Sequence, residues 1–402
     1  MKVLMINVVC GIGSTGRICT DLATELEKQG HEIKIAYGRE KVPKQFQKYA
    51  VRVGTDLDVY MHALKSRLFD SAGFESKRVT KKFVNWIREY DPDVIHLHNL
   101  HGYYINVEIL FQYLKECGKK IIWTLHDCWA FTGHCTYFDY IDCDKWKKSC
   151  ARCPQKKEYP TSCLKDNSYY NFRRKKDVFQ NIPNMTLVTP SNWLKTLISQ
   201  SFLRKYPVNV IHNGIDTSVF KPVDYSIQER LRQEFGILNK TIILGVASVW
   251  NRRKGLDIFV ALSKLLPENY QIVLIGVDKK QAKKLPDNII TIARTNNTEE
   301  LAAWYSTADI FVNPTLEDNY PTVNLEAIAC GTPVITFDTG GSPESAVLYG
   351  KIVERGNIRM LLSFIKSKDF IQRTNDVETS IDYKNFWNSY NAFYGDNERV
   401  KE

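Results

Sequence analysis

Short apolar runs alternate with amphipathic stretches along the chain. The first run, residues 2–8, is strand-like, and the stretch over residues 15–29 has helical composition and stops at Gly30. Further strand-like runs occupy residues 32–37, 93–98, 120–127 and 185–190. Strands and helices that alternate in this way are typical of a parallel sheet covered by helices, so the sequence predicts an α/β fold.

The alternation restarts in the second half of the chain. Strands are expected at residues 242–248, 271–276, 288–293 and 309–314. Because 402 residues are too many for one ordinary hydrophobic core, we expect two doubly wound, Rossmann-like domains. The predicted domains are residues 1–200 and residues 201–380, with a hinge near residues 192–222. Aromatic residues recur every three or four positions in residues 381–394, which predicts a final helix with a buried stripe.

Composition narrows the class of protein. Hydrophobic residues make up 44% of the chain, enough for two packed cores. No apolar run reaches the ~18 residues of a membrane-spanning helix, and residues 1–9 are too short and too strand-like for a secretory signal. Ten cysteines without an export signal argue against a disulfide framework. We therefore expect a cytoplasmic protein.

The net charge of +10 is concentrated in one segment. Residues 144–176 hold eleven basic and three acidic residues. A solvated loop-and-helix face explains such a segment. So does a patch for anionic lipid head groups or a lipid-diphosphate acceptor, to which each basic residue contributes about 1 kcal/mol. The second interpretation predicts a peripheral protein at the inner face of the cell membrane. Nucleic acid is disfavoured, because no recognised nucleic-acid motif accompanies the charge.

A glycine-rich turn, GIGSTGR at residues 11–17, joins the first expected strand to its helix. A GxGxxG turn in this setting can hold a dinucleotide. The second strand of such a fold ends in an acid, whereas here it ends in Tyr37, Gly38 and Arg39. An NAD-dependent oxidoreductase is therefore disfavoured, and a tight turn without a ligand is the simplest alternative.

Histidines gather at the ends of two expected strands. His96, His98 and His101 lie in or after one strand, and His126 lies at the end of the next. The first three are candidates for a metal site, although their spacing does not favour it. The carboxyl end of a central parallel strand faces the ligand crevice, which makes His126 a candidate ligand contact. A core histidine paired with Asp127 is the alternative.

Six of the ten cysteines fall within residues 128–163. Cys150 and Cys153 form a C-x2-C knuckle, preceded by Cys135 and Cys143 in a loop rich in glycine and aspartate. Four thiolates can close a tetrahedral zinc site, and an insertion with little core of its own gains folding energy from one. Reduced cysteines packed as small hydrophobic residues, or disulfides, are the alternatives. Zinc at this site would be structural.

Residues 313–344 follow the order strand, loop, helix, strand. Glu317 and Asp318 stand side by side in the loop, and Glu326 lies in the helix expected over residues 323–330. Ligands of doubly wound sheets bind at the carboxyl ends of strands, where this loop lies. A helix start offers N–H groups to an anion, and an acid one turn further can accept hydrogen bonds from ribose hydroxyls.

A second anion site is expected in residues 247–255. Arg252, Arg253 and Lys254 stand at the start of an amphipathic helix. Their charges and the helix dipole both favour a bound anion. A run of surface charge is the alternative.

These motifs resemble the retaining glycosyltransferases of the GT-B fold in family 4, which include group 1 transferases of the bacterial capsule, O-antigen and colanic-acid type. Residues 325–335, LEAIACGTPVI, match the end of the E-x7-E signature of that family. Residues 208–220, VNVIHNGIDTSVF, resemble its inter-domain segment. The first acid departs from the signature: eight residues before Glu326 stands Asp318, with Glu317 one step earlier, and either is a candidate for its role.

The resemblance implies that the two domains face one another across a cleft, the first holding the acceptor and the second the nucleotide-sugar. A final segment, residues 381–402, would cross back to the first domain. In the second domain, Glu326 would take the nucleotide ribose, while Lys254 and Arg253 neutralise the diphosphate leaving group. Asp318 or Glu317 would orient the sugar.

The remaining implied contacts involve both domains. Thr322 and its neighbours would offer backbone N–H groups to the donor. Gly13 would approach the donor phosphate or sugar, and His126 would bind the sugar, with His98 or His101 also in reach. Fixed cations and a helix terminus would stabilise the negative charge that develops on the leaving phosphate, so no catalytic metal is expected.

The expected activity is transfer of a sugar, with retention, from a UDP- or GDP-linked donor to a polyprenyl-diphosphate-linked or oligosaccharide acceptor. The process implied by the resemblance is bacterial surface polysaccharide biosynthesis. A nucleotide-sugar epimerase of the same fold would need no acceptor, and a binding protein without activity would show no turnover.

Overall fold

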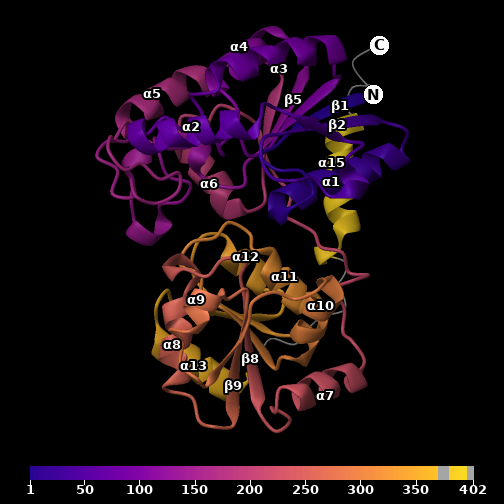
Figure 1. The fold of residues 1–402 in the computed structure, drawn as a ribbon, viewed down its shortest axis with the longest axis vertical. Coiled ribbons are helices and arrows are strands. Elements are labelled where there is room, and N and C mark those ends of the chain that lie inside the picture. Colours follow the sequence, from indigo (N-terminus) through magenta and orange to yellow (C-terminus); the bar gives the residue numbers. More distant parts are fainter. Residues whose placement is uncertain (370–379, 396–402) are drawn as a thin grey trace. The chain divides into compact units, whose positions relative to one another are not determined.

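The computed structural model describes residues 1–369 and 380–395. This part of the chain divides into two compact units (Figure 1). Unit 1 contains Met1–Ile211 together with the chain from Phe393 onward, and unit 2 contains His212–Ala392. The division after Ile211 lies inside the expected hinge, past the expected boundary at residue 200. No helix among the described residues is long and apolar enough to cross a membrane.

Unit 1 is built on a seven-stranded sheet in the order β3-β2-β1-β4-β5-β6-β7. The strands are β1 (Lys2–Ile6), β2 (Glu32–Tyr37), β3 (Ala50–Arg52), β4 (Val94–Leu97), β5 (Lys120–Thr124), β6 (Met185–Thr189) and β7 (Val208–Val210). The helices are α1 (Gly13–Lys28), α2 (Asp56–Phe69), α3 (Lys77–Tyr90), α4 (Val107–Glu116), α5 (Ser168–Phe179) and α6 (Asn192–Gln200). All pairings are parallel, and Val3 of β1 stands beside both Ile33 and Val94, so the strand order reverses between β1 and β4.

The strands of unit 1 are short and apolar because parallel strands are covered on both faces. Four of the five residues of β1, and all four of β4, are buried. Ser191 caps α6: its side chain accepts a hydrogen bond of 3.1 Å from the Leu194 amide. The edge strand β3 is not among the expected strands, because three residues are too few to show a strand periodicity.

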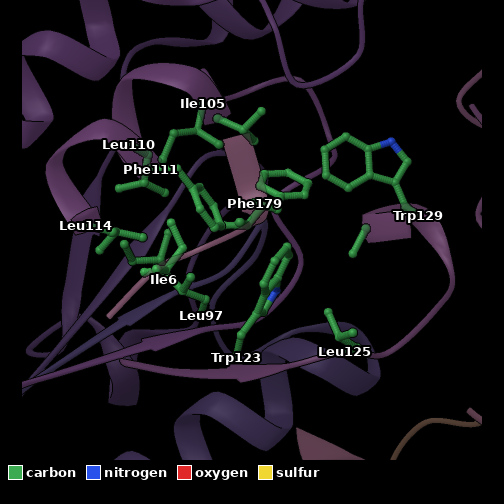
Figure 2. Close-up of a cluster of buried hydrophobic side chains, with 14 of the residues drawn as sticks. Ile6, Leu97, Ile105, Leu110, Phe111, Leu114, Trp123, Leu125, Trp129 and Phe179 are labelled. Atoms are coloured by element: carbon green, nitrogen blue, oxygen red, sulfur yellow. The ribbon is translucent and has the colours of Figure 1, made fainter. Parts of the chain in front are cut away.

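The core of unit 1 is rich in aromatic side chains (Figure 2). Trp123 of β5 meets Phe111 of α4 and Phe179 of α5 at ring-centroid distances of 5.2 and 5.0 Å, and the two phenylalanines are 4.5 Å apart. Trp129, just beyond β5, lies 6.3 Å from Phe179. These rings fix the chain that leaves β5 against α5, which positions the carboxyl end of β5.

Unit 2 is built on a six-stranded sheet in the order β10-β9-β8-β11-β12-β13. Its strands are β8 (Thr241–Val246), β9 (Tyr270–Ile275), β10 (Ile289–Ile292), β11 (Ile310–Asn313), β12 (Val334–Phe337) and β13 (Gly350–Val353). Its helices include α7 (Tyr225–Glu234), α8 (Leu256–Ser263), α9 (Lys279–Ala282), α10 (Thr298–Thr307), α11 (Thr322–Ala329), α12 (Ser342–Ala346) and α13 (Ile358–Ser367). Every pairing is again parallel, and the order reverses between β8 and β11.

The last described helix, α15 (Tyr383–Gly395), carries the expected aromatic stripe: Phe386, Trp387, Tyr390 and Tyr394 are buried. Its first residues belong to unit 2 and its last to unit 1. Within unit 1, the Tyr394 hydroxyl lies 2.6 Å from Nδ1 of His96 in β4. Residues 396–402 of the expected final segment lie outside the described residues.

Candidate functional site

The loops that follow β8 and β11 meet where the strand order of unit 2 reverses. β8 leads into η5 (Arg252–Lys254), and β11 leads into the loop before α11. The Leu316 amide donates to the Arg253 carbonyl at 2.8 Å, which ties one loop to the other. Gly255 makes this approach possible, because a Cβ there would lie 2.3 Å from the Pro314 carbonyl oxygen. Such a reversal point is where doubly wound sheets bind ligands.

An ion pair spans these two loops. Lys254 Nζ lies 2.5 Å from Asp318 Oδ2, with the two side chains 24% and 14% exposed. Burial alone would raise the pKa of Asp318, but Lys254, and behind it Arg253, lowers the pKa below its ordinary value. The site therefore holds an ionised carboxylate beside an ammonium group, both close enough to solvent to exchange partners.

The two neighbouring acids have different surroundings. Glu317 is buried, and its carbonyl oxygen accepts hydrogen bonds of 3.0 Å from Arg253 and from Thr315. The Asp318 carbonyl accepts a 3.1 Å hydrogen bond from the Gly341 amide. A Cβ at Gly340 would lie 1.9 Å from that same oxygen, so the turn needs glycine there. These contacts fix the backbone so that Asp318 meets Lys254, which favours Asp318 over Glu317 for the role left open by the sequence.

Glu326 is oriented by a tyrosine that the sequence analysis missed. Tyr305 of α10 donates to Glu326 Oε2 at 2.9 Å. Burial raises the pKa of Tyr305, as does Glu326 itself, so the hydroxyl keeps its proton and remains a donor. Thr322 is the first residue of α11, and no side chain of the described residues caps this helix start. The N–H groups of its first turn are therefore not taken by a capping side chain.

A buried polar network supports the start of α11. Asn324 accepts a 2.8 Å hydrogen bond from Asn313, at the end of β11, and donates to Ser345 at 2.9 Å. Thr336 of β12 lies 2.7 Å from the Ser342 hydroxyl. Asn313 and Asn324 are amide residues within otherwise apolar elements, and buried amides need hydrogen-bond partners. That pattern is the feature of the sequence from which the network could have been predicted. The network joins β11, α11, β12 and α12 below the ligand loops.

Unit 1 places its candidate residues at its own reversal point, between β1 and β4. Gly13 is the first residue of α1, with φ of +63°, and a Cβ there would meet no atom within 4 Å. Its backbone is therefore open to approach. By contrast, a Cβ at Gly38, after β2, would lie 2.0 Å from Tyr104. That packing occupies the position where a dinucleotide fold presents its acid.

The histidines form pairs at the ends of β4 and β5. His98 Nδ1 lies 3.0 Å from Nε2 of His126, and His101 Nε2 lies 2.7 Å from Asp127 Oδ2. Asp127 thus pairs with His101. His96 is held in the core, with Thr124 Oγ1 2.8 Å from its Nε2. Among the described residues, no three His, Cys, Asp or Glu side chains stand at metal-ligand spacing, which gives no support to a histidine metal site.

The sequence matches two family models. Residues 15–219 match the model described as "Glycosyltransferase Family 4", and residues 240–367 match "Glycosyl transferases group 1". The chain belongs to glycosyltransferase family 4. It is 23% identical over 382 residues to the "Putative colanic acid biosynthesis glycosyl transferase WcaC" of Escherichia coli (strain K12), covering 91% of this chain and 90% of that protein.

Solved structures show the fold of this family 4 glycosyltransferase. Sucrose-phosphate synthase from Thermosynechococcus elongatus superposes with a TM-score of 0.70 at 16% identity and 98% coverage of each chain. Anabaena Alr3699/HepE in complex with UDP-glucose superposes with a TM-score of 0.65 at 14% identity, covering 98% of this chain and 100% of that one. The expectation of two parallel α/β sheets in a GT-B fold is confirmed.

Most of the predicted donor residues of the glycosyltransferase lie on two adjacent loops and one helix of unit 2. Lys254 and Arg253 contact the backbone or side chains of Glu317 and Asp318 directly. Glu326 and Thr322 stand on α11, which follows that loop. Gly13 and His126 lie at strand ends of unit 1. The cysteines at 135, 143, 150 and 153 belong to the loop between β5 and α5.

The pH dependence of unit 1 follows from its buried histidines. Burial lowers the pKa of His126 to about 4, although Asp127 acts in the opposite direction. The unfolded chain takes up this proton near pH 6.5. As the pH falls from about 6.5 to about 4, the free energy of unfolding should therefore decrease by up to about 1.4 kcal/mol per pH unit. We expect His126→Asn to remove the contribution of His126 to this pH dependence. Hydrogen exchange of the β4 and β5 amides, measured as a function of pH, tests this expectation.

The matched control is His212→Asn, in unit 2, which should leave the pH dependence of unit 1 unchanged. Equal slopes for wild type and His126→Asn would show that the pKa of His126 is not depressed in the folded protein.

Proposed function

We propose that this glycosyltransferase transfers a sugar, with retention, from a UDP- or GDP-linked donor to a polyprenyl-diphosphate-linked or oligosaccharide acceptor. The observation that carries the proposal is the Lys254–Asp318 ion pair at the reversal point of unit 2. It combines a cation for a diphosphate with a carboxylate for sugar hydroxyls. The HepE structure bound to UDP-glucose supports the class of donor.

Donor binding rearranges this pair. Phosphate oxygens are strong acceptors for a lysine ammonium, so the diphosphate draws Lys254 from Asp318. Asp318, still ionised, then accepts hydrogen bonds from the sugar. Arg253 is held to the Glu317 carbonyl at 3.0 Å and supplies a second positive charge. The ion pair of the free enzyme therefore keeps both groups charged until the donor replaces their mutual contact.

The nucleoside is bound by α11. Tyr305 orients the Glu326 carboxylate through a 2.9 Å hydrogen bond, and we assign this carboxylate to the ribose hydroxyls as an acceptor. The first-turn N–H groups at Thr322 add donors for the diphosphate. We assign Gly13 and His126 of unit 1 to the donor phosphate or sugar. Its low pKa keeps His126 neutral near pH 7, so it contacts a sugar hydroxyl as a neutral group.

The chemical step needs charge stabilisation on the leaving diphosphate. Lys254, Arg253 and the α11 terminus place fixed positive charge there before the glycosidic bond breaks, so little reorganisation is required. We propose that this arrangement takes the place of a divalent cation. The negative charge gained by the departing oxygen is then balanced by groups already in position.

The acceptor and the process are proposed from the WcaC relative and from the basic segment. WcaC is named for colanic acid biosynthesis, and this chain covers 90% of its length. Residues 144–176, with eleven basic residues against three acidic ones, suit a lipid-diphosphate acceptor at an anionic membrane surface. We place the enzyme in the cytoplasm, peripheral to the inner face of the membrane, in bacterial surface polysaccharide synthesis.

Incubation with a panel of UDP- and GDP-sugars, with and without a polyprenyl-diphosphate-linked sugar, tests the proposal. One donor should stabilise the protein by about 2.7 kcal/mol at 100 times its Kd, and its sugar should appear on the acceptor with the donor's anomeric configuration by NMR. Conversion of a donor without acceptor would indicate an epimerase. Failure of every donor to bind would overturn the proposal.

Loss of the Lys254 ammonium should slow transfer selectively. We expect Lys254→Ala to lower kcat/KM by about 10²–10³-fold, because a cation on the leaving phosphate acts most strongly in the transition state. Lys264→Ala, at the exposed end of α8, is the matched control and should retain wild-type activity. A Lys254→Ala enzyme that folds and keeps its kcat/KM would refute the assignment.

A further inference from the structure

The loop between β5 and α5 contains no strand or α-helix. Only the short turns η2 (Trp129–Phe131), η3 (Asp139–Ile141) and η4 (Lys145–Lys147) interrupt it. A small aromatic group of Phe131, Phe138 and Trp146, with ring centroids 4.9 to 6.3 Å apart, supplies its packing. A loop of this length with so little regular structure is uncommon in a compact domain.

Four cysteines line one small cavity in this loop. They are Cys135, Cys143, Cys150 and Cys153, which we call the cysteine cluster. The cavity has a volume of about 20 Å³, enough for a single water molecule or ion. All four thiols are free of disulfide bonds. These four residues lie within nineteen positions of the sequence, and in the folded chain they line the same cavity.

Contacts within the cluster resemble those of thiolate ligands. Cys135 and Cys153 are close enough to interact electrostatically. The Gly133 amide donates to Cys150 Sγ at 3.2 Å, and a Cβ at Gly133 would lie 2.7 Å from the Cys150 side chain. Backbone N–H groups that donate to sulfur stabilise a deprotonated thiol, which is the form that binds metal.

The C-x2-C turn is held in shape by a lysine. Lys145 Nζ donates to the carbonyls of Ala151 and Arg152 at 3.0 and 3.1 Å, and Arg152 has φ of +48°. The turn therefore curls back on itself with Cys150 at one end and Cys153 at the other. This shape lets both sulfur atoms reach the same cavity.

A buried lysine lies close to the cluster. Lys175 of α5 is buried, and its ammonium donates to the carbonyls of Trp129 and Thr132 at 2.7 and 3.1 Å. No salt bridge among the described residues includes it. Cys135 and Cys150 are close enough to act on it electrostatically, as are the carboxylates of Asp70 and Asp127. A zinc ion with four thiolates carries a net charge of −2, which would add to the negative charge that these carboxylates already place near Lys175.

We propose that the cysteine cluster binds one structural Zn²⁺ ion. The thiols lose their protons on binding, and the ion draws the four sulfur atoms into a tetrahedron. The side chains must turn to reach it, because no three candidate ligands in the described residues already stand at metal-ligand spacing. The ion fixes the loop between β5 and α5 and leaves the donor residues of unit 2 untouched.

Elemental analysis of the full chain, expressed with zinc and purified without chelator, tests the proposal. We expect about one zinc per chain, a visible absorption typical of tetrahedral thiolate after exchange for Co²⁺, and loss of both in Cys150→Ser/Cys153→Ser. Cys163→Ser, which removes the exposed cysteine of the same segment, is the matched control and should keep the metal.

Wild-type protein that holds no zinc, and takes up none when Zn²⁺ is added to the reduced chain, would overturn the proposal. So would zinc retained at full stoichiometry by the double variant. Nucleotide binding provides a separate readout: the double variant should bind UDP or GDP as the wild type does, so loss of the metal is distinguishable from failure of the donor site.

Discussion

One ion pair, Lys254 with Asp318, joins the two loops of the proposed donor site in this glycosyltransferase. Its partners come from loops after two different strands, 64 residues apart in sequence, and their atoms lie 2.5 Å apart. Because both side chains are largely buried, each would carry a desolvation cost without the other. The pair therefore keeps a cation and a carboxylate charged at the proposed donor site, where we expect the diphosphate to bind Lys254 and the sugar to bind Asp318.

The strand order explains why these groups meet. In a parallel sheet, loops at adjacent carboxyl ends diverge only where the order reverses, and β8 and β11 are the neighbours at that point in unit 2. Close backbone approaches at Gly255 and Gly340 then bring the loops into contact. The buried network of Asn313 and Asn324 holds α11 beneath them. The proposed donor residues are thus positioned by backbone geometry as well as by the Lys254–Asp318 pair.

Much of the fold was predictable because apolar runs and their stops identify parallel strands directly. The sequence also made Lys254, Glu326 and the two adjacent acids candidates, because the segments that contain them resemble motifs of the family. It could not choose between Glu317 and Asp318, a choice that depends on which side chain the Gly340 turn directs toward Lys254. Tyr305 was beyond reach, because a tyrosine within an apolar helix looks like any core residue until its hydroxyl is seen beside Glu326.

The most direct test of the central claim is a crystal structure of the enzyme with its nucleotide diphosphate-sugar. The account predicts Lys254 Nζ within hydrogen-bonding distance of a phosphate oxygen, Glu326 on the ribose hydroxyls, and Asp318 released from Lys254 to the sugar. A nucleotide bound elsewhere, with the Lys254–Asp318 pair intact and Glu326 without a ligand contact, would contradict it.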